Sequence, residues 1–497
     1  MQWTRKLKQM KRVKYLLIVP LVFLNITCTE WMELLPPEGL TREHYWQTKE
    51  EVEAVLMAAY GSFRNMDGYL LKIGEIRADM IADGGNMGGD DRRAMNGNIH
   101  PDNGLARWAG FYGVINYCNE VIEYAPLVRD IDNTFTDFQM RLYLAEAHWL
   151  RALSYFYLVR IFRDVPLVLH STRSDESEIY LKKTEGDEIL EHITNELLQY
   201  RSYATVEGYR SVTENKGRVT RAAYDALLAD IALWRFDYEA VITHVSHIQA
   251  AGNHQLVLGS RWFQLYYPGN TVESIFEFQF DNNLNQQNSI YGMTERNANN
   301  LDPSQKAIQM FGRLTSRERT RGDDASIKRY GEDEYIIWKY VGLAGDGMSI
   351  RPGFIAQSAN FIVYRYADVL LMKAEALSQS GQFGEALNII NMIRDRAGVP
   401  PLSLPPSEIA YEDAILNERA LELAFEGKRW FDLLRMGRRN DYARKNVLIN
   451  MIIANVPSTQ KRILSMKLNN PMGWYLPIHE NEIERNRELV QNPYYTL

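Results

Sequence analysis

The densest group of side chains that could do chemistry lies in Ile415–Gly437. Its acids and guanidinium groups recur at three- and four-residue spacing, so on a helix they are neighbours. They are Glu418, Arg419, Glu422, Glu426, Arg429 and Asp432. Two such carboxylates could serve as a catalytic acid and base. The alternative is an ion-pair network that fixes how the helix packs, because an arginine fork satisfies a carboxylate bidentately and can be buried with it. The sequence favours the network.

Two histidines, His244 and His247, have the spacing of metal ligands on one helical turn. No third ligand is evident beside them, which favours a coincidental pair on a helix surface. The motifs H-E-x-x-H, G-x-S-x-G, C-x-x-C and the P-loop do not occur in the sequence. Glycosidases need two carboxylates about 5 to 10 Å apart, a distance that sequence spacing does not reveal. A hydrolase is therefore the least favoured class, and no cofactor or metal is expected.

The segment 84–104 is polar and rich in glycine, which predicts an exposed loop without a helix. Long loops in compact domains often bind ligands. Asp79, Asp83, Asp90 and Asp91 could chelate Ca²⁺ through carboxylate oxygens, but their spacing does not fit an EF-hand loop. A solvated acidic turn is favoured.

The stretch Phe361–Gly437 contains the elements that position the charge cluster. Residues 367–377 and 383–393 each place apolar residues at helical spacing, and Ser380-Gly381 separates them. Small residues let the two backbones approach closely, so the pattern predicts an antiparallel hairpin of tetratricopeptide type. Ile415–Gly437 is predicted to follow as a third, longer helix. A similar layout in Ala226–Ala240 indicates repeated helical hairpins.

Helical periodicity stops between residues 253 and 360. Ser274–Asn282 alternates apolar and polar residues, as a strand does, and 282–360 is rich in Asn, Gln, Gly and Asp. The predicted fold is therefore mainly α, with tetratricopeptide-like hairpins as the scaffold and an irregular, partly β insertion that carries the ligand surface.

Several ordered motifs resemble the SusD/RagB family of nutrient-binding lipoproteins. They are RYADVLLMKAEAL from Arg365, RDRAG from Arg394, NERALELAFEGKRWFDLLRMG from Asn417, and WYLPI and QNPYY near the end of the chain. Trp108, Tyr112, Ile115 and Asn119 match a further family pattern, with Trp108 expected to pack in the core first and to serve as a sugar platform second. The resemblance covers nearly the whole chain after residue 28. It implies a SusD-like α/α superhelix, a glycan ligand, no enzymatic activity, and a partner that is a SusC-like TonB-dependent transporter.

The N-terminus resembles that of a lipoprotein. Six basic residues precede an apolar run, Tyr15–Ile26, which is too short to span a bilayer, and Cys28 follows it. Residues 1–27 are predicted to be a signal peptide, Cys28 the lipidated residue and 28–39 a tether, which implies an outer-membrane protein that is exposed on the cell surface. An ordinary cleaved signal with a chance cysteine is the alternative. The formal charge of −7 falls to −13 without the six basic residues, which disfavours nucleic-acid binding.

The remaining predicted boundaries are a helical N-terminal part at 40–252, the irregular region at 253–360 and a helical C-terminal part at 361–497. A sugar binder lays tyrosine or tryptophan rings against sugar C–H faces and pairs hydroxyls with polar side chains. The predicted ligand-binding residues are Asn86, Arg92, Arg93, Asn283, Tyr291, Tyr335 and Trp338. For each aromatic residue, core packing is the alternative. A peptide or another nutrient in place of a glycan stays open as the ligand.

Overall fold

The computed structural model describes residues 45–172, 180–298, 300–312, 320–322, 324–332, 334–344, 346, 348–353 and 357–496. The segment from Thr48 to Leu497 forms one compact unit. The predicted signal peptide, Cys28 and the tether lie outside the described residues. No helix among those that the structure describes is long and apolar enough to cross a membrane.

Helices dominate the first half of the compact unit. They are α3 (Lys49–Arg64), α4 (Asp67–Glu75), α5 (Gly89–Met95), α6 (Ala109–Ile131), α7 (Asp137–Phe162), α8 (Gly186–Tyr200), α9 (Val212–Gly217), α10 (Arg221–Trp234) and α11 (Tyr238–Ala251). Helix α7 shows how the sequence sets a boundary. Its capping residue Thr136 accepts a hydrogen bond from the Gln139 amide at 3.2 Å, and the Gln139 side chain accepts one from the Thr136 amide at 3.2 Å. This capping box satisfies two amides that the first turn would otherwise leave unpaired.

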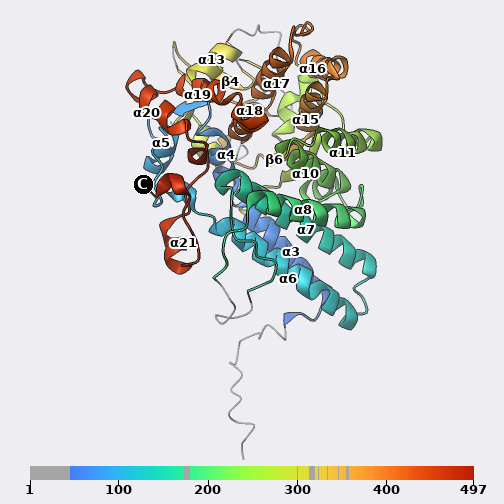
Figure 1. The fold of residues 1–497 in the computed structure, drawn as a ribbon. Coiled ribbons are helices and arrows are strands. Elements are labelled where there is room, and N and C mark those ends of the chain that lie inside the picture. Colours follow the sequence, from blue (N-terminus) through green and yellow to red (C-terminus); the bar gives the residue numbers. More distant parts are fainter. Residues whose placement is uncertain are drawn as a thin grey trace, which may run out of the picture. The chain divides into compact units, whose positions relative to one another are not determined.

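The second half contains short strands and a further set of helices. These helices are α12 (Ile290–Thr294), α13 (Gln305–Phe311), α15 (Tyr366–Gln379), α16 (Phe383–Arg396), α17 (Glu408–Glu422), α18 (Arg429–Tyr442), α19 (Lys445–Ile453), α20 (Ser458–Leu468) and α21 (Glu480–Arg485). Helices α6, α7, α8, α10, α11, α15 and α17 pack against one another in succession, so paired helices form a continuous stack (Figure 1). The predicted helical scaffold is confirmed.

The α15–α16 hairpin has the predicted form. Gly381 has a φ of +75°, a left-handed conformation that glycine adopts without a steric penalty, and it reverses the chain between the two helices. Ala374 and Ala386 are fully buried in the core cluster between the helices, together with Leu370 and Ile390. Small side chains at these positions allow the two helices to pack closely.

Within the described residues, the strands form three antiparallel pairs, β1 (Ile81–Asp83) with β3 (Leu301–Pro303), β2 (Ser274–Phe278) with β6 (Phe361–Arg365), and β4 (Ile327–Arg329) with β5 (Tyr335–Ile337). The predicted strand at 274–282 is β2, which is shorter than expected. It is buried along its whole length and joins the irregular region to the strand that leads directly into α15. The predicted partly β character of this region is confirmed.

Two sequence predictions about elements are wrong. The expected long helix 415–437 is divided into α17 and α18, because Phe425 and Gly427 have φ angles of +63° and +73° and turn the chain between them. The glycine-rich segment 84–104 is not helix-free, since α5 forms within it. Gly88 precedes α5, and an aspartate pair in its first turn suits the positive end of the helix dipole.

Candidate ligand-binding site

The charge cluster of α17 and α18 is an ion-pair network, as the sequence favoured. Arg365 on β6 contacts Glu422 at 2.7 Å, Glu426 at 2.8 Å and Glu273 at 2.7 Å. Arg321 adds contacts of 2.6 Å to Glu418 and 3.0 Å to Glu422, and Arg396 also binds Glu422. The side chains of this network are buried, with that of Arg396 5% exposed, so none is placed to meet a substrate from solvent.

The electrostatics of the network keep its members charged. Burial by itself would raise the pKa of Glu422, but Arg396, Arg365 and Arg321 hold that pKa well below its usual value. Next along the network, Asp368 contacts Arg419 at 3.0 Å and Lys428 at 2.9 Å. Burial opposes ionisation there too, yet the two cations lower the pKa of Asp368 to about 2. The network therefore ties the α17–α18 segment to β6 and α15.

The four aspartates considered for Ca²⁺ each have a cationic partner instead. Asp79 contacts Arg429 at 2.7 Å and is fully buried. Asp83 pairs with Arg92, Asp90 with Arg93, and Asp91 with Lys72. Asp79 and Asp91 are buried, so a solvated acidic turn describes only Asp83 and Asp90.

The structure assembles a polar, tyrosine-containing surface from the irregular region, which we call the tyrosine face. Its members are Tyr291 on α12, Arg296 after α12, Asp302 on β3, and Tyr330 and Glu334 in the turn between β4 and β5. The Arg296 guanidinium lies 4.8 Å from the centroid of the Tyr330 ring and contacts Glu334 at 2.7 Å.

Solvent reaches this surface. The Tyr330 side chain is 37% exposed, and the side chains of Arg296 and Glu334 are about half exposed. Partial burial raises the pKa of Tyr291, with Glu295 and Tyr330 adding to the rise, so the two tyrosine rings are electrostatic neighbours. The surface combines aromatic rings with a forked donor and carboxylate acceptors, as recognition of a sugar requires.

Asp302 connects this surface to the glycine-rich segment. Its strand β3 pairs with β1, with Ala82 opposite Asp302. Burial raises the pKa of Asp302 to about 6, with Glu334 and Asp83 adding to the rise. The predicted ligand residue Asn86 donates a hydrogen bond to the Ala298 carbonyl oxygen at 3.2 Å, two residues from Arg296. Asn86 thus lies beside the tyrosine face.

The raised pKa of Asp302 predicts a pH dependence of stability. Between pH 4 and pH 6 the folded protein retains a proton that the unfolded chain loses, so stability falls as pH rises through this window. We expect Asp302→Asn to remove this fall and to stabilise the protein at pH 7 by about 1 kcal/mol, a value reduced for solvent screening. Urea unfolding at pH 4 and pH 7 measures the effect. An equal loss of stability between pH 4 and pH 7 in the wild type and in Asp302→Asn would contradict this expectation.

The other predicted ligand residues are dispersed. Arg92 and Arg93 lie on α5 and line an open hollow of about 400 Å³ together with Asn96, Gln460 and Lys467. Asn283 lies in a short turn where its amide donates to Asp281 at 2.8 Å, and it is exposed.

Tyr335 and Trp338 make other contacts. Tyr335 pairs with Arg329 across the β4–β5 hairpin, and the Arg329 guanidinium lies 5.9 Å from the centroid of its ring. Trp338 is only 1% exposed, and Lys328 Nζ lies 4.6 Å from its ring centroid. Trp338 therefore packs in the core, the alternative given for it above, and the centroid of its ring lies 6.3 Å from that of Tyr330. Trp108 likewise packs in the core, with 4% of its surface exposed.

Four members of the tyrosine face were not predicted from the sequence: Tyr330, Arg296, Glu334 and Asp302. The signal that could have found Tyr330 is local. Gly331 and the acids after it separate two short β-prone runs, which is typical of a hairpin whose ends are exposed. The proximity of Arg296 and Asp302 depends on long-range strand pairing.

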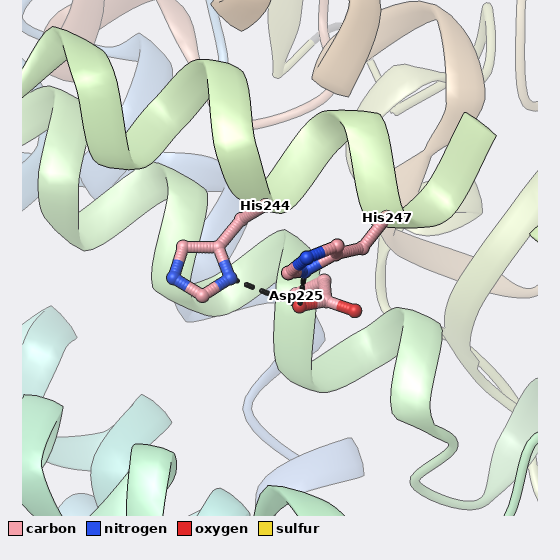
Figure 2. A group of neighbouring side chains, drawn as sticks. All are labelled: Asp225, His244 and His247. Atoms are coloured by element: carbon pink, nitrogen blue, oxygen red, sulfur yellow. Dashed lines mark hydrogen bonds and ion pairs between the residues drawn. The ribbon is translucent and has the colours of Figure 1, made fainter. Parts of the chain in front are cut away.

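The histidine pair also differs from its prediction, because a third donor lies next to it. Asp225 on α10 faces both His244 and His247 on α11 (Figure 2). Its Oδ1 lies 2.9 Å from Nδ1 of His244 and 3.4 Å from Nδ1 of His247.

Comparisons with known proteins agree with this architecture. The SusD family model matches residues 263–495. The SusD-like protein P38 of Formosa agariphila is 25% identical over 481 residues, which cover 86% of this chain and 91% of that protein. Surface glycan-binding protein A from Bacteroides uniformis has a TM-score of 0.73 at 23% identity, covering 90% of this chain and 100% of that one. A laminarin binding SusD-like protein has a TM-score of 0.69 at 21% identity, and the match covers 90% of this chain and 100% of that one.

The chain is similar to the SusD family. The family model covers the second half, and the relatives and solved structures extend the similarity over about nine-tenths of the chain. The resemblance inferred from the sequence motifs is confirmed.

Proposed function

We propose that this protein binds a polysaccharide or oligosaccharide at the tyrosine face and does not cleave it. The observation that carries the proposal is the partly exposed Tyr330 beside Arg296 and Glu334. A ring of this kind receives the C–H face of a sugar, while the guanidinium donates to hydroxyl oxygens and the carboxylate accepts from hydroxyl groups. Two structural neighbours are named for binding laminarin and surface glycans, which supports a ligand of the same class.

The lack of an enzymatic role is part of the proposal. The acids of the α17–α18 network are buried and paired with cations, so they serve packing. On the tyrosine face, Glu334 is held by Arg296, whose side-chain hydrogen bond lowers the pKa of that carboxyl. A general acid in a glycosidase needs the opposite shift, a raised pKa.

The cellular role follows from the family and from the N-terminal sequence. We infer that Cys28 carries a lipid that anchors the protein to the outer membrane, because the apolar run before it is too short to span a bilayer as a helix. We also infer that the bound glycan passes to a SusC-like TonB-dependent transporter. Mass spectrometry of the membrane-extracted protein tests the anchor. Co-purification of a TonB-dependent transporter with the tagged protein tests the partner.

Calorimetric titration tests the ligand. The purified chain is titrated with a panel of polysaccharides and oligosaccharides, and with peptides as the comparison set. We expect one glycan class to bind and Tyr330→Ala to weaken that binding about tenfold, which is about 1.4 kcal/mol.

Tyr117→Ala on α6 is the matched control, because the Tyr117 side chain has the same 37% exposure as Tyr330 but lies on another element. It should leave affinity unchanged. Binding of peptides but of no glycan would contradict the proposal. An equal loss of glycan affinity in Tyr330→Ala and Tyr117→Ala would contradict it as well.

A further inference from the structure

The Asp225 cluster lies in the helical scaffold, on elements that do not contribute to the tyrosine face. His244 and His247 are three residues apart on α11, so their rings project from the same side of that helix toward α10 (Figure 2). Asp225 projects from α10 into the space between them. The three donor atoms, two imidazole nitrogens and one carboxylate oxygen, lie within 4.8 Å of one another.

The two separations from the Asp225 carboxylate oxygen fit a tetrahedral metal centre. Zinc binds imidazole nitrogen at about 2.0–2.1 Å and carboxylate oxygen at about 2.0–2.2 Å, which places tetrahedral ligand atoms about 3.3 Å apart. The observed distances from Asp225 Oδ1 to the two Nδ1 atoms are 2.9 and 3.4 Å. A neutral imidazole carries its proton on either nitrogen, so both Nδ1 atoms can present a lone pair.

The carboxylate already has a partner that fixes its orientation. Arg201 donates from Nε to Asp225 Oδ1 at 2.8 Å and from Nη2 to Oδ2 at 2.6 Å. Hydrogen bonds of this kind to a ligating carboxylate are typical around metal centres, where they orient the first ligand. The Asp225 carboxylate is 3% exposed, whereas His247 is 48% exposed, so an ion can enter from the His247 side.

We propose that Asp225, His244 and His247 form a binding site for a divalent ion of the zinc class, with a fourth position open to water. Two imidazoles and one carboxylate form the ligand set that such borderline ions prefer over Ca²⁺ or Mg²⁺. The ligands come from both helices of the α10–α11 hairpin, so the bound ion links the two helices. This site concerns the scaffold and is independent of the glycan proposal.

Isothermal titration of the chelator-treated chain with ZnCl₂ tests the site. We expect about one equivalent to bind, and His247→Gln to weaken that binding by about tenfold or more. The half-exposed position of His247 makes this variant compatible with folding. Replacing zinc with Co²⁺ should give the visible absorption of tetrahedral Co²⁺, and ZnCl₂ should raise the melting temperature of the wild type more than that of His247→Gln.

His170→Gln is the matched control, because His170 is an exposed histidine that contacts the carboxylate of Glu123 and lies outside the Asp225 cluster. It should bind ZnCl₂ as the wild type does. Equal affinity of the wild type and His247→Gln would overturn the proposal, and so would Co²⁺ binding without the tetrahedral absorption.

Discussion

Replacing Glu422 with alanine is expected to cost about 3–5 kcal/mol of folding stability or more. The substitution leaves Arg365, Arg396 and Arg321 buried without one of their shared carboxylates. A buried charge that loses its partner retains its full desolvation cost, so the loss exceeds that of an ordinary hydrogen bond. Differential scanning calorimetry and urea unfolding of the purified variant measure the loss.

The control for this prediction is Arg129→Ala. Arg129 contacts Asp137 at 2.6 Å, but the two side chains are 34% and 65% exposed. Exposed ion pairs contribute about 0–1 kcal/mol, so this variant should unfold almost as the wild type does. A Glu422→Ala protein that lost no more stability than Arg129→Ala would show that the buried network is not what holds α17 and α18 in place.

The substitution Gly74→Ala is expected to destabilise the protein by about 3 kcal/mol or more. A Cβ atom at this position of α4 would lie 2.6 Å from Gly427 Cα and closer still to the Gly427 carbonyl group. Both obstacles are backbone, so no rotamer change relieves the overlap. Glu75 on α4 also holds this helix close to Gly427, because its Oε1 accepts hydrogen bonds from the amides of Gly427 at 2.9 Å and Lys428 at 3.2 Å.

Gly61→Ala is the matched control for Gly74→Ala. Gly61 also lies within a helix, α3, and among the described residues nothing comes within 4 Å of a Cβ placed there. Alanine is favoured over glycine in a helix by about 1 kcal/mol, so this variant should be slightly more stable than the wild type. Thermal unfolding of both variants distinguishes a specific contact from a general effect of alanine. Similar melting temperatures for the two would contradict the close packing of α4 on Gly427.

Local spacing was sufficient to predict the scaffold. The apolar stripes of α15 and α16 and the glycine between them predict the hairpin, because each signal lies within a few residues of the element that it defines. The same holds for the charge network, where three- and four-residue spacing places Glu418, Glu422 and Arg419 near one another. Spacing did not reveal Arg365, Arg321 or Glu273 as partners, because these come from distant strands and loops.

The break between α17 and α18 was missed for a physical reason. Apolar residues continue at helical spacing through Phe425 because both helices pack on the same core, and this continuity concealed the left-handed turn at Phe425 and Gly427. Gly427 was the available stop signal.

The candidate site was harder to predict than the scaffold. Tyr291 was identified from its irregular, polar surroundings, but its neighbour Tyr330 approaches it only after β4 and β5 pair. Trp338 lies in the same kind of irregular, polar segment as Tyr291, so the sequence did not distinguish a buried ring from an exposed one. Its backbone amide instead donates to the Ser326 carbonyl at 2.9 Å, just beyond the β4–β5 pair, and its ring is buried.

The most direct test of the proposed function is a crystal structure of the protein with the tightest-binding oligosaccharide from the calorimetric panel. We predict a sugar ring against Tyr330, with hydroxyl groups hydrogen-bonded to Arg296 and Glu334. A sugar bound instead in the hollow of Arg92, Arg93 and Lys467, with the tyrosine face empty, would contradict the assignment of the site.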